Sequence, residues 1–116
     1  MQEGDLKQRT KNFALSIINL SNSIVNTDLG KIIKRQLLRS ATAVGANTRA
    51  AFRGRSQKEF IAKLGTVIEE ADESFYWLEL LIEGKMINKS GTIKALMKES
   101  EELTAIFVSI KQRYKT

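Results

Sequence analysis

The sequence predicts an all-α fold, an antiparallel up-down-up-down four-helix bundle, and three observations lead to this prediction. The chain of 116 residues contains no proline, so no residue in it enforces a helix break. Apolar residues recur at intervals of three and four along four successive stretches, which is the period of a helix that buries one face. The segments between these stretches are short, which favours antiparallel neighbours. We therefore expect a single domain that covers residues 1–116.

The first two helices are defined by apolar positions that lie four and three residues apart. In the first helix these positions are Phe13, Ile17, Leu20 and Ile24, and in the second they are Ile33, Leu37, Ala41 and Val44. Between the two helices, Asn26–Asp28 can turn the chain and cap the second helix. The second helix also carries an uncharged run of small residues, Ser40–Thr48. This run indicates either the narrowest part of the bundle or one side of an oligomer seam.

The third helix has the longest pattern, with apolar or small residues at Phe60, Leu64, Val67, Ala71, Ser74, Leu78 and Leu81. The run Ser56–Glu59 is typical of a capping box at its start, and Gly54 just before it can take the positive φ that a chain reversal often needs. Gly84 and residues 88–91 mark the connection to the fourth helix. The apolar positions of that helix are Ile93, Leu96, Leu103, Phe107, Ile110 and Tyr114.

The composition excludes several classes of function. The chain has no cysteine and no histidine, so it can form neither a disulfide, nor a Ser-His-Asp triad, nor a zinc site of the His/Cys type. We therefore expect no catalytic residues, no metal and no cofactor, and we predict that the protein is not an enzyme. The polar start, Met1–Asp5, is unlike a signal peptide, and no apolar run approaches the ~18 residues of a membrane span. A cytoplasmic protein without membrane contact is the expectation.

The charge of the chain is concentrated in one segment. Between Asp28 and Glu59 there are eight basic residues and no acid, whereas the rest of the chain has eleven basic and thirteen acidic residues. A block of one sign creates a local field that suits a polyanion or an acidic protein surface. The predicted nucleic-acid-binding residues are Lys31, Lys34, Arg35, Arg39, Arg49, Arg53 and Arg55. Among them, Arg35, Arg39, Arg49 and Arg53 recur at intervals of four, ten and four residues, so they can share one stripe of a helix. A stripe of this kind would hold phosphates without reading bases, and the alternative is a solvated or subunit-facing surface.

Two long segments resemble a known family. The run from Gln36 to Asn47 is similar to the second-helix signature of the bacterial four-helix bundle family that includes proteins encoded by intervening sequences in 23S ribosomal RNA genes. The similarity continues through Ser56–Leu64 and reaches Glu70–Leu81, whose end Tyr-Trp-Leu-Glu-Leu-Leu resembles the family's third helix. Many members carry a glutamate where this chain has Ala50, and a polar residue where it has Phe75.

The resemblance implies properties that the residue pattern alone does not. It implies a left-handed bundle and a homo-oligomeric ring, most often a pentamer. A related accessory protein of diversity-generating retroelements shares the fold and is implied to bind nucleic acid and a reverse transcriptase. The expected partners are therefore other copies of the chain, RNA or DNA, and a reverse transcriptase or another protein. The competing interpretation is a protein scaffold with no nucleic-acid activity.

Three further groups of residues, in the second and third helices, have expected roles. An acidic block, Glu69 to Glu83, is expected to pair with the basic block, either inside the bundle or across a subunit boundary in a head-to-tail ring. The consecutive aromatic residues Phe75, Tyr76 and Trp77 cannot all face one core, so we predict an oligomer interface there, with ordinary core and base stacking as alternatives. Asn47 is expected to set the register of the helices by a hydrogen bond to Glu70 or Glu73.

Overall fold

The computed structural model describes residues 3–88 and 90–114 and places four helices in these ranges. They are α1 (Glu3–Ser21), α2 (Asp28–Phe52), α3 (Gln57–Glu83) and α4 (Ser90–Gln112). The described residues contain no strand, so the all-α prediction and the four predicted helices are confirmed. Within the same ranges, no helix combines the length and the apolar character that crossing a membrane requires.

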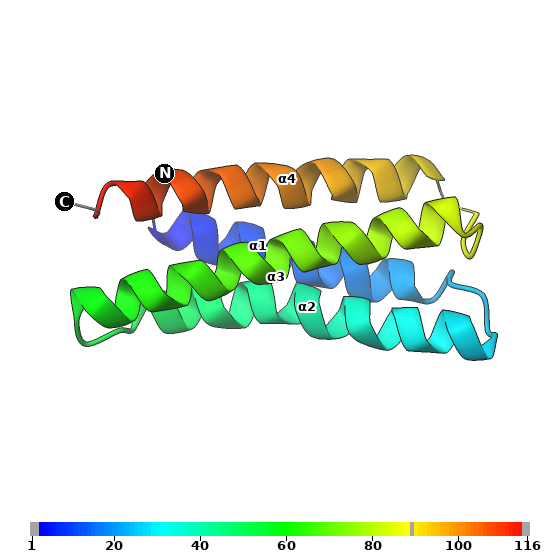
Figure 1. Cartoon of the computed structure of the whole chain (residues 1–116), viewed down its shortest axis with the longest axis horizontal. Coiled ribbons are helices and arrows are strands. Elements are labelled where there is room, and N and C mark those ends of the chain that lie inside the picture. Colours follow the sequence, from blue (N-terminus) through cyan, green and yellow to red (C-terminus); the bar gives the residue numbers. More distant parts are fainter. Residues whose placement is uncertain (1–2, 89, 115–116) are drawn as a thin grey trace.

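The helices lie side by side along the long axis of a body that measures 46 × 23 × 22 Å. α1 contacts α2, α2 contacts α3, α3 contacts α4, and α4 contacts α1, so the helices surround one shared core. Figure 1 shows the α1–α2 and α3–α4 loops at one end of the body, and the α2–α3 loop at the other. A backbone hydrogen bond of 2.9 Å from Val25 N–H to the Met86 carbonyl joins the two loops at the first end.

Side-chain caps begin the second and third helices as the sequence predicts. The Thr27 hydroxyl accepts a hydrogen bond of 3.0 Å from the backbone N–H of Gly30 at the start of α2. At the start of α3, the Ser56 hydroxyl accepts one of 3.1 Å from the N–H of Glu59. The Glu59 carboxylate accepts in turn from the backbone N–H of Arg55 at 2.7 Å, one residue earlier than in a regular capping box.

The prediction of a positive φ at Gly54 is wrong. None of the described glycines has a positive φ, and the only described non-glycine residue that does is Lys85, at φ 55°, after the end of α3. α2 ends instead in tight turns, with hydrogen bonds from Arg53 N–H to the Ala50 carbonyl at 3.2 Å and from Gly54 N–H to the Ala51 carbonyl at 3.1 Å. These i to i−3 bonds keep φ in the negative region while the chain leaves the helix.

The core runs the length of the bundle and takes apolar side chains from every helix. Its largest fully buried members include Phe13, Ile17, Leu37, Leu64, Leu78, Leu103 and Phe107, all at positions that the sequence pattern predicted. At the end of α4 the apolar pattern predicts more burial than the structure shows. Ile110 is only half-buried, and Tyr114 lies beyond the helix and is 40% exposed. The small-residue run lies where two backbones approach: a Cβ on Gly45 would be 3.5 Å from the Thr10 carbonyl oxygen of α1.

Candidate nucleic-acid interface

The cations of α2 lie on the side of the helix that faces away from the core. Lys31, Arg35, Arg39 and Arg49 are exposed, as is Arg53 directly after the helix. The buried residues of α2 recur on the opposite side of the helix, at Gly30, Ile33, Leu37, Ser40, Ala41, Val44, Thr48 and Ala51. The outward cations are spaced by four, four, ten and four residues, which keeps them on one stripe of a helix. The structure therefore brings the predicted stripe together on one surface.

The two remaining residues of the predicted site lie beside this stripe. Lys34 is half-buried on the flank of α2, and Arg55 is exposed in the loop that leads to α3. The centre of the stripe is occupied by short side chains, because Thr42 and Ala46 fill the outward positions between Arg39 and Arg49 and are both exposed. A backbone or a phosphate could approach the helix closely at this point.

Arg39 differs from the other cations of the stripe because it is bound to α3. Its guanidinium donates to the Glu70 carboxylate through Nη1 at 3.1 Å and Nη2 at 3.2 Å, and it also donates to Glu73. These hydrogen bonds raise the pKa of the Arg39 guanidinium, with Glu70 the larger cause. The contact joins the basic and acidic blocks inside one bundle, as one of the two alternatives from the sequence predicts.

Glu73 extends this contact to an aromatic side chain. The indole Nε1–H of Trp77 donates to the Glu73 carboxylate at 2.9 Å, one helical turn further along α3. The hydrogen bond from Trp77 and the interactions with Arg39 lower the pKa of Glu73, against the opposing effect of burial. Directly beneath, the buried hydroxyls of Ser40 and Ser74 are 2.9 Å apart, so α2 and α3 are connected by polar contacts both at the surface and in the core.

The role predicted for Asn47 is wrong. Its side-chain amide donates to the carbonyl of Ala43, one turn earlier in the same helix, at 2.9 Å. The two glutamates expected to receive it, Glu70 and Glu73, bind Arg39 instead. The side-chain amide of an asparagine in a helix can donate its hydrogen bond to a backbone carbonyl of the preceding turn. The longer side chain of Arg39 reaches from α2 to the carboxylates of α3, a distance that the short amide cannot span.

Most cations of the stripe have no carboxylate partner within the bundle. In residues 3–88 and 90–114, ion pairs form between Lys7 and Glu3, between Arg9 and both Glu99 and Glu102, and between Arg39 and both Glu70 and Glu73. Arg39 is thus the one member of the predicted nucleic-acid site that is ion-paired in the part of the chain that the structure describes. The remaining members present uncompensated positive charge to solvent.

The acidic block of α3 is divided between two surfaces. Glu70 and Glu73 point toward α2, whereas Glu69, Asp72 and Glu83 are not ion-paired in the described ranges and lie away from that contact. No group of three or more carboxylates in those ranges is arranged to hold a metal ion. Glu69, Asp72 and Glu83 thus give α3 a negatively charged surface, which is opposite in charge to the exposed surface of α2.

The consecutive aromatic residues of α3 are divided in the way that the helical period requires. Tyr76 is 50% exposed, while Phe75 and Trp77 are half-buried on either side of it. The rings of Tyr76 and Trp77 meet edge-to-face, with centroids 5.1 Å apart. Tyr76 is thus an exposed aromatic residue beside the acidic surface, and the oligomer interface predicted at these three residues stays a prediction.

Comparison with known proteins identifies the family. The sequence matches the family described as 23S rRNA-intervening sequence protein over residues 2–109. The chain belongs to this family. A crystal structure at 1.70 Å of a protein with unknown function from the S23 ribosomal protein family of Bacteroides thetaiotaomicron VPI-5482 is similar to it, with a TM-score of 0.86 and 35% identity over 97% of this chain and 99% of that chain. A search of curated proteins found no match.

The segments that resemble the family by sequence carry the contacts between α2 and α3. The run from Gln36 to Asn47 supplies Arg39 and Ser40, and the run from Glu70 to Leu81 supplies their partners. In this member of the 23S rRNA-intervening sequence protein family, the resembling segments thus include the residues that fix the second helix against the third.

Sequence reasoning missed a group of residues at the end of the bundle formed by the α2–α3 loop. There, Phe52, Phe60 and Tyr114 pack ring against ring, with centroids 5.6 Å apart for the first pair and 5.2 Å for the second. The apolar spacing predicts core positions for Phe60 and Tyr114, and it gives Phe52 no role. The signal that could have found the group was that these aromatic residues lie near helix ends, beside arginine and lysine.

Proposed function

We propose that the protein is a non-catalytic, oligomeric four-helix bundle that binds the nucleic-acid backbone through the outer face of α2. The observation that carries this proposal is the row of exposed cations on α2 without carboxylate partners among the described residues, formed by Lys31, Arg35, Arg49 and Arg53. The planar guanidinium of arginine can donate two parallel hydrogen bonds to the oxygens of one phosphate. The family name, which refers to 23S rRNA, and the ribosomal family of the Bacteroides structure support RNA as the first nucleic acid to test.

Binding of this kind would be independent of sequence. The centre of the stripe is formed by Thr42 and Ala46, whose side chains are too short to reach into a groove from a helix that rests on the phosphates. The cations on either side would neutralise phosphates and release counterions, so the affinity should fall steeply with salt concentration. Arg39 contributes less than the other arginines in this proposal, because it could bind a phosphate only by leaving Glu70 and Glu73.

The oligomeric part of the proposal concerns the acidic surface of α3. In this proposal, copies of an antiparallel, left-handed up-down-up-down bundle meet head to tail through α3, which leaves the outer face of α2 free for nucleic acid. Tyr76 is 50% exposed and would bury against the next copy. We propose a cytoplasmic homo-oligomer, a pentamer, with Phe75 to Trp77 in its interface and with a reverse transcriptase or another protein as a further partner. Light scattering that gives the mass of a monomer at micromolar concentration would contradict this part.

Fluorescence anisotropy with labelled RNA and DNA, in single- and double-stranded form and at several salt concentrations, tests the binding. Replacing Arg35, Arg49 and Arg53 together by glutamine should weaken binding to every nucleic acid. It should also flatten the salt dependence, by about 0.9 for each phosphate of duplex DNA that the variant no longer neutralises. The matched control replaces three lysines on other helices, Lys11, Lys94 and Lys98, by glutamine, which removes the same charge.

The two triple variants separate the alternatives. If both weaken binding equally, only the net charge matters, and α2 is not the interface. If the wild-type protein binds no nucleic acid at low salt, the protein is instead a scaffold whose charged faces bind protein. Loss of the oligomer in the α2 variant alone would assign the stripe to a subunit boundary.

A further inference from the structure

The end of the bundle at the α2–α3 loop combines an exposed aromatic ring with a row of packed rings behind it. Phe60 lies between Phe52 and Tyr114, and its ring meets the Tyr114 ring at 71° with centroids 5.2 Å apart. Phe52 and Phe60 are half-buried and fixed by their helices, whereas Tyr114 is 40% exposed. The tyrosine ring is therefore supported from inside and accessible from outside.

Two shallow hollows lie beside these rings. The first, of about 320 Å³, has no charged residue in its lining, which consists of Ala51, Phe52, Gly54, Ser56, Gln57, Phe60 and Tyr114. The second, of about 370 Å³, is lined by Ala50, Arg53, Gly54, Arg55, Glu59, Ala62 and Lys63. Both include Gly54, so an aromatic hollow and a basic hollow adjoin at the α2–α3 loop. An apolar, flat surface bordered by cations suits a planar aromatic group attached to phosphates.

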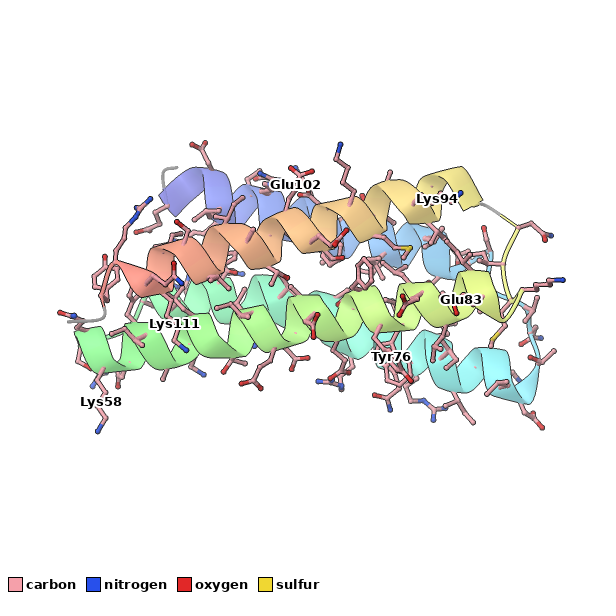
Figure 2. The ribbon with its side chains drawn as sticks, turned by 45° about the horizontal axis from the view of Figure 1, so that its top comes forward. Lys58, Tyr76, Glu83, Lys94, Glu102 and Lys111 are labelled. Atoms are coloured by element: carbon pink, nitrogen blue, oxygen red, sulfur yellow. The ribbon has the colours of Figure 1, made fainter. Side chains whose placement is uncertain are left out.

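The segment that lines these hollows is rich in positive charge. Residues 49–63 contain five cations, Arg49, Arg53, Arg55, Lys58 and Lys63, and a single acid, Glu59. The Glu59 carboxylate is occupied by the backbone N–H of Arg55 at 2.7 Å. Lys111 and Arg113 add two cations from the end of α4, and Figure 2 shows Lys58 and Lys111 at the same end of the bundle. None of these seven cations has an ion pair within the described ranges.

Tyr76, the other exposed tyrosine, can be compared with Tyr114. This tyrosine is 50% exposed and also packs edge-to-face on another ring, that of Trp77, but it lies on α3 close to Asp72 and Glu79, which have no ion pair in the described ranges. In Figure 2, Tyr76 is well separated from the end that carries Lys58 and Lys111. Repulsion between carboxylates and phosphates would exclude nucleic acid from Tyr76, whereas the field around Tyr114 attracts it.

We infer that this end of the bundle binds single-stranded nucleic acid, with one unpaired base stacked on Tyr114 and the adjoining phosphates held by Arg53, Arg55 and Lys58. The inference rests on the proposed nucleic-acid function and specifies its substrate class. Aromatic side chains in a positively charged groove are the general means of holding single strands, because every base has a π-face. The bases of a continuous duplex are already stacked on each other, so they cannot use such a ring without unpairing.

Binding of a labelled single-stranded oligonucleotide of about twelve residues, within the usual site sizes of single-strand binding folds, tests the inference directly. Tyr114→Ala should weaken it by about 5- to 150-fold, the range for one stacked base, and should leave binding to a duplex of the same length unchanged. Tyr114→Phe should retain the affinity, because the ring and not the hydroxyl is required. The comparison variant, Tyr76→Ala, removes the other exposed tyrosine; because Tyr76 belongs to the proposed oligomer interface, any change it causes should be equal for single strand and duplex.

A second measurement uses the wild-type protein and so does not depend on the folding of a variant. Irradiation of the complex with an oligonucleotide that contains 5-iodouridine should cross-link to Tyr114, and mass spectrometry of the digested adduct would locate the residue. Separate RNA and DNA oligonucleotides show which strand type is preferred.

The outcomes distinguish this inference from the proposed function. Binding to duplex with no binding to single strands, or cross-links that avoid Tyr114 together with unchanged affinity of Tyr114→Ala, overturns the inference and leaves the α2 interface standing. Absence of any nucleic-acid binding overturns both. If Tyr76→Ala weakens single-strand binding as much as Tyr114→Ala does and leaves duplex binding unchanged, the inference is also overturned, since the two rings would then be equivalent.

Discussion

Replacing Arg39 by glutamine should destabilise the bundle, whereas the same replacement at Arg35 should leave its stability nearly unchanged. The two arginines are one helical turn apart on the same exposed stripe of α2, and the sequence pattern makes them equivalent. Arg39 is bound to Glu70 and Glu73 of α3, while Arg35 has no ion pair in the described ranges. The pair therefore isolates the contribution of one interhelical contact, with residue type and location held constant.

The expected cost at Arg39 follows from the exposure of the partners. Hydrogen bonds to charged groups contribute about 1.5–3 kcal/mol when buried, and exposed ion pairs about 0.2–1 kcal/mol. The Arg39 side chain is 49% exposed, so its contribution to stability should lie near the range for exposed ion pairs. The Glu70 side chain is only 16% exposed, and the substitution would leave this carboxylate without its cation, which adds to the cost. We expect a loss of about 1–2 kcal/mol in the free energy of unfolding. Each kcal/mol should lower the melting temperature of a domain of this length by about 4 °C. Arg35→Gln should change the stability by less than about 0.5 kcal/mol.

Thermal unfolding followed by circular dichroism, at one protein concentration for all variants, measures this difference. Arg35→Gln should weaken nucleic-acid binding more than Arg39→Gln does, because Arg35 is available to a phosphate and Arg39 is not. Equal melting temperatures for the two variants would show that the contact with Glu70 and Glu73 contributes nothing. Equal losses of binding would show that these carboxylates do not keep Arg39 from phosphate, and the reasoning from the structure would then fail.

Two other changes test the packing and the electrostatics. Glu73→Gln should lower the free energy of unfolding at neutral pH. The difference in stability between this variant and the wild type should narrow as the pH falls below about 4.5, because the pKa of Glu73 is lowered in the folded state and its stabilisation is lost on protonation. Acid unfolding that shows the same difference at every pH would contradict this. Gly30→Ala should destabilise strongly, since its Cβ would clash with the Val25 carbonyl oxygen. Gly45→Ala, whose Cβ would lie 3.5 Å from its nearest neighbour, should be neutral or stabilise by up to about 1 kcal/mol. Denaturant melts of the two glycine variants compare them directly, and equal effects would refute the close approach at Gly30.

The individual residues show why parts of the candidate site could be predicted and others could not. The α2 stripe was predictable because helical spacing fixes which residues share a face once the helix is recognised. The partner of Arg39 was not, because the sequence offered several carboxylates on α3 and gave no rotation of one helix against the other. Asn47 was misassigned for a related reason: its hydrogen bond to the Ala43 carbonyl is local, and a local bond leaves no trace in a pattern of interhelical spacing.

The sequence by itself determined the four helices, their inward faces, the cap at Ser56, a second cap within Asn26–Asp28, and the concentration of positive charge on α2. These properties depend on residues within one or two turns of each other, where the chain geometry is known in advance. Only the tertiary structure decided that Arg39 is held by α3 and that Tyr114, from the end of the chain, meets Phe60 beside a basic loop. Contacts between distant segments depend on how the helices are rotated and staggered, and the summed packing of the whole core sets both.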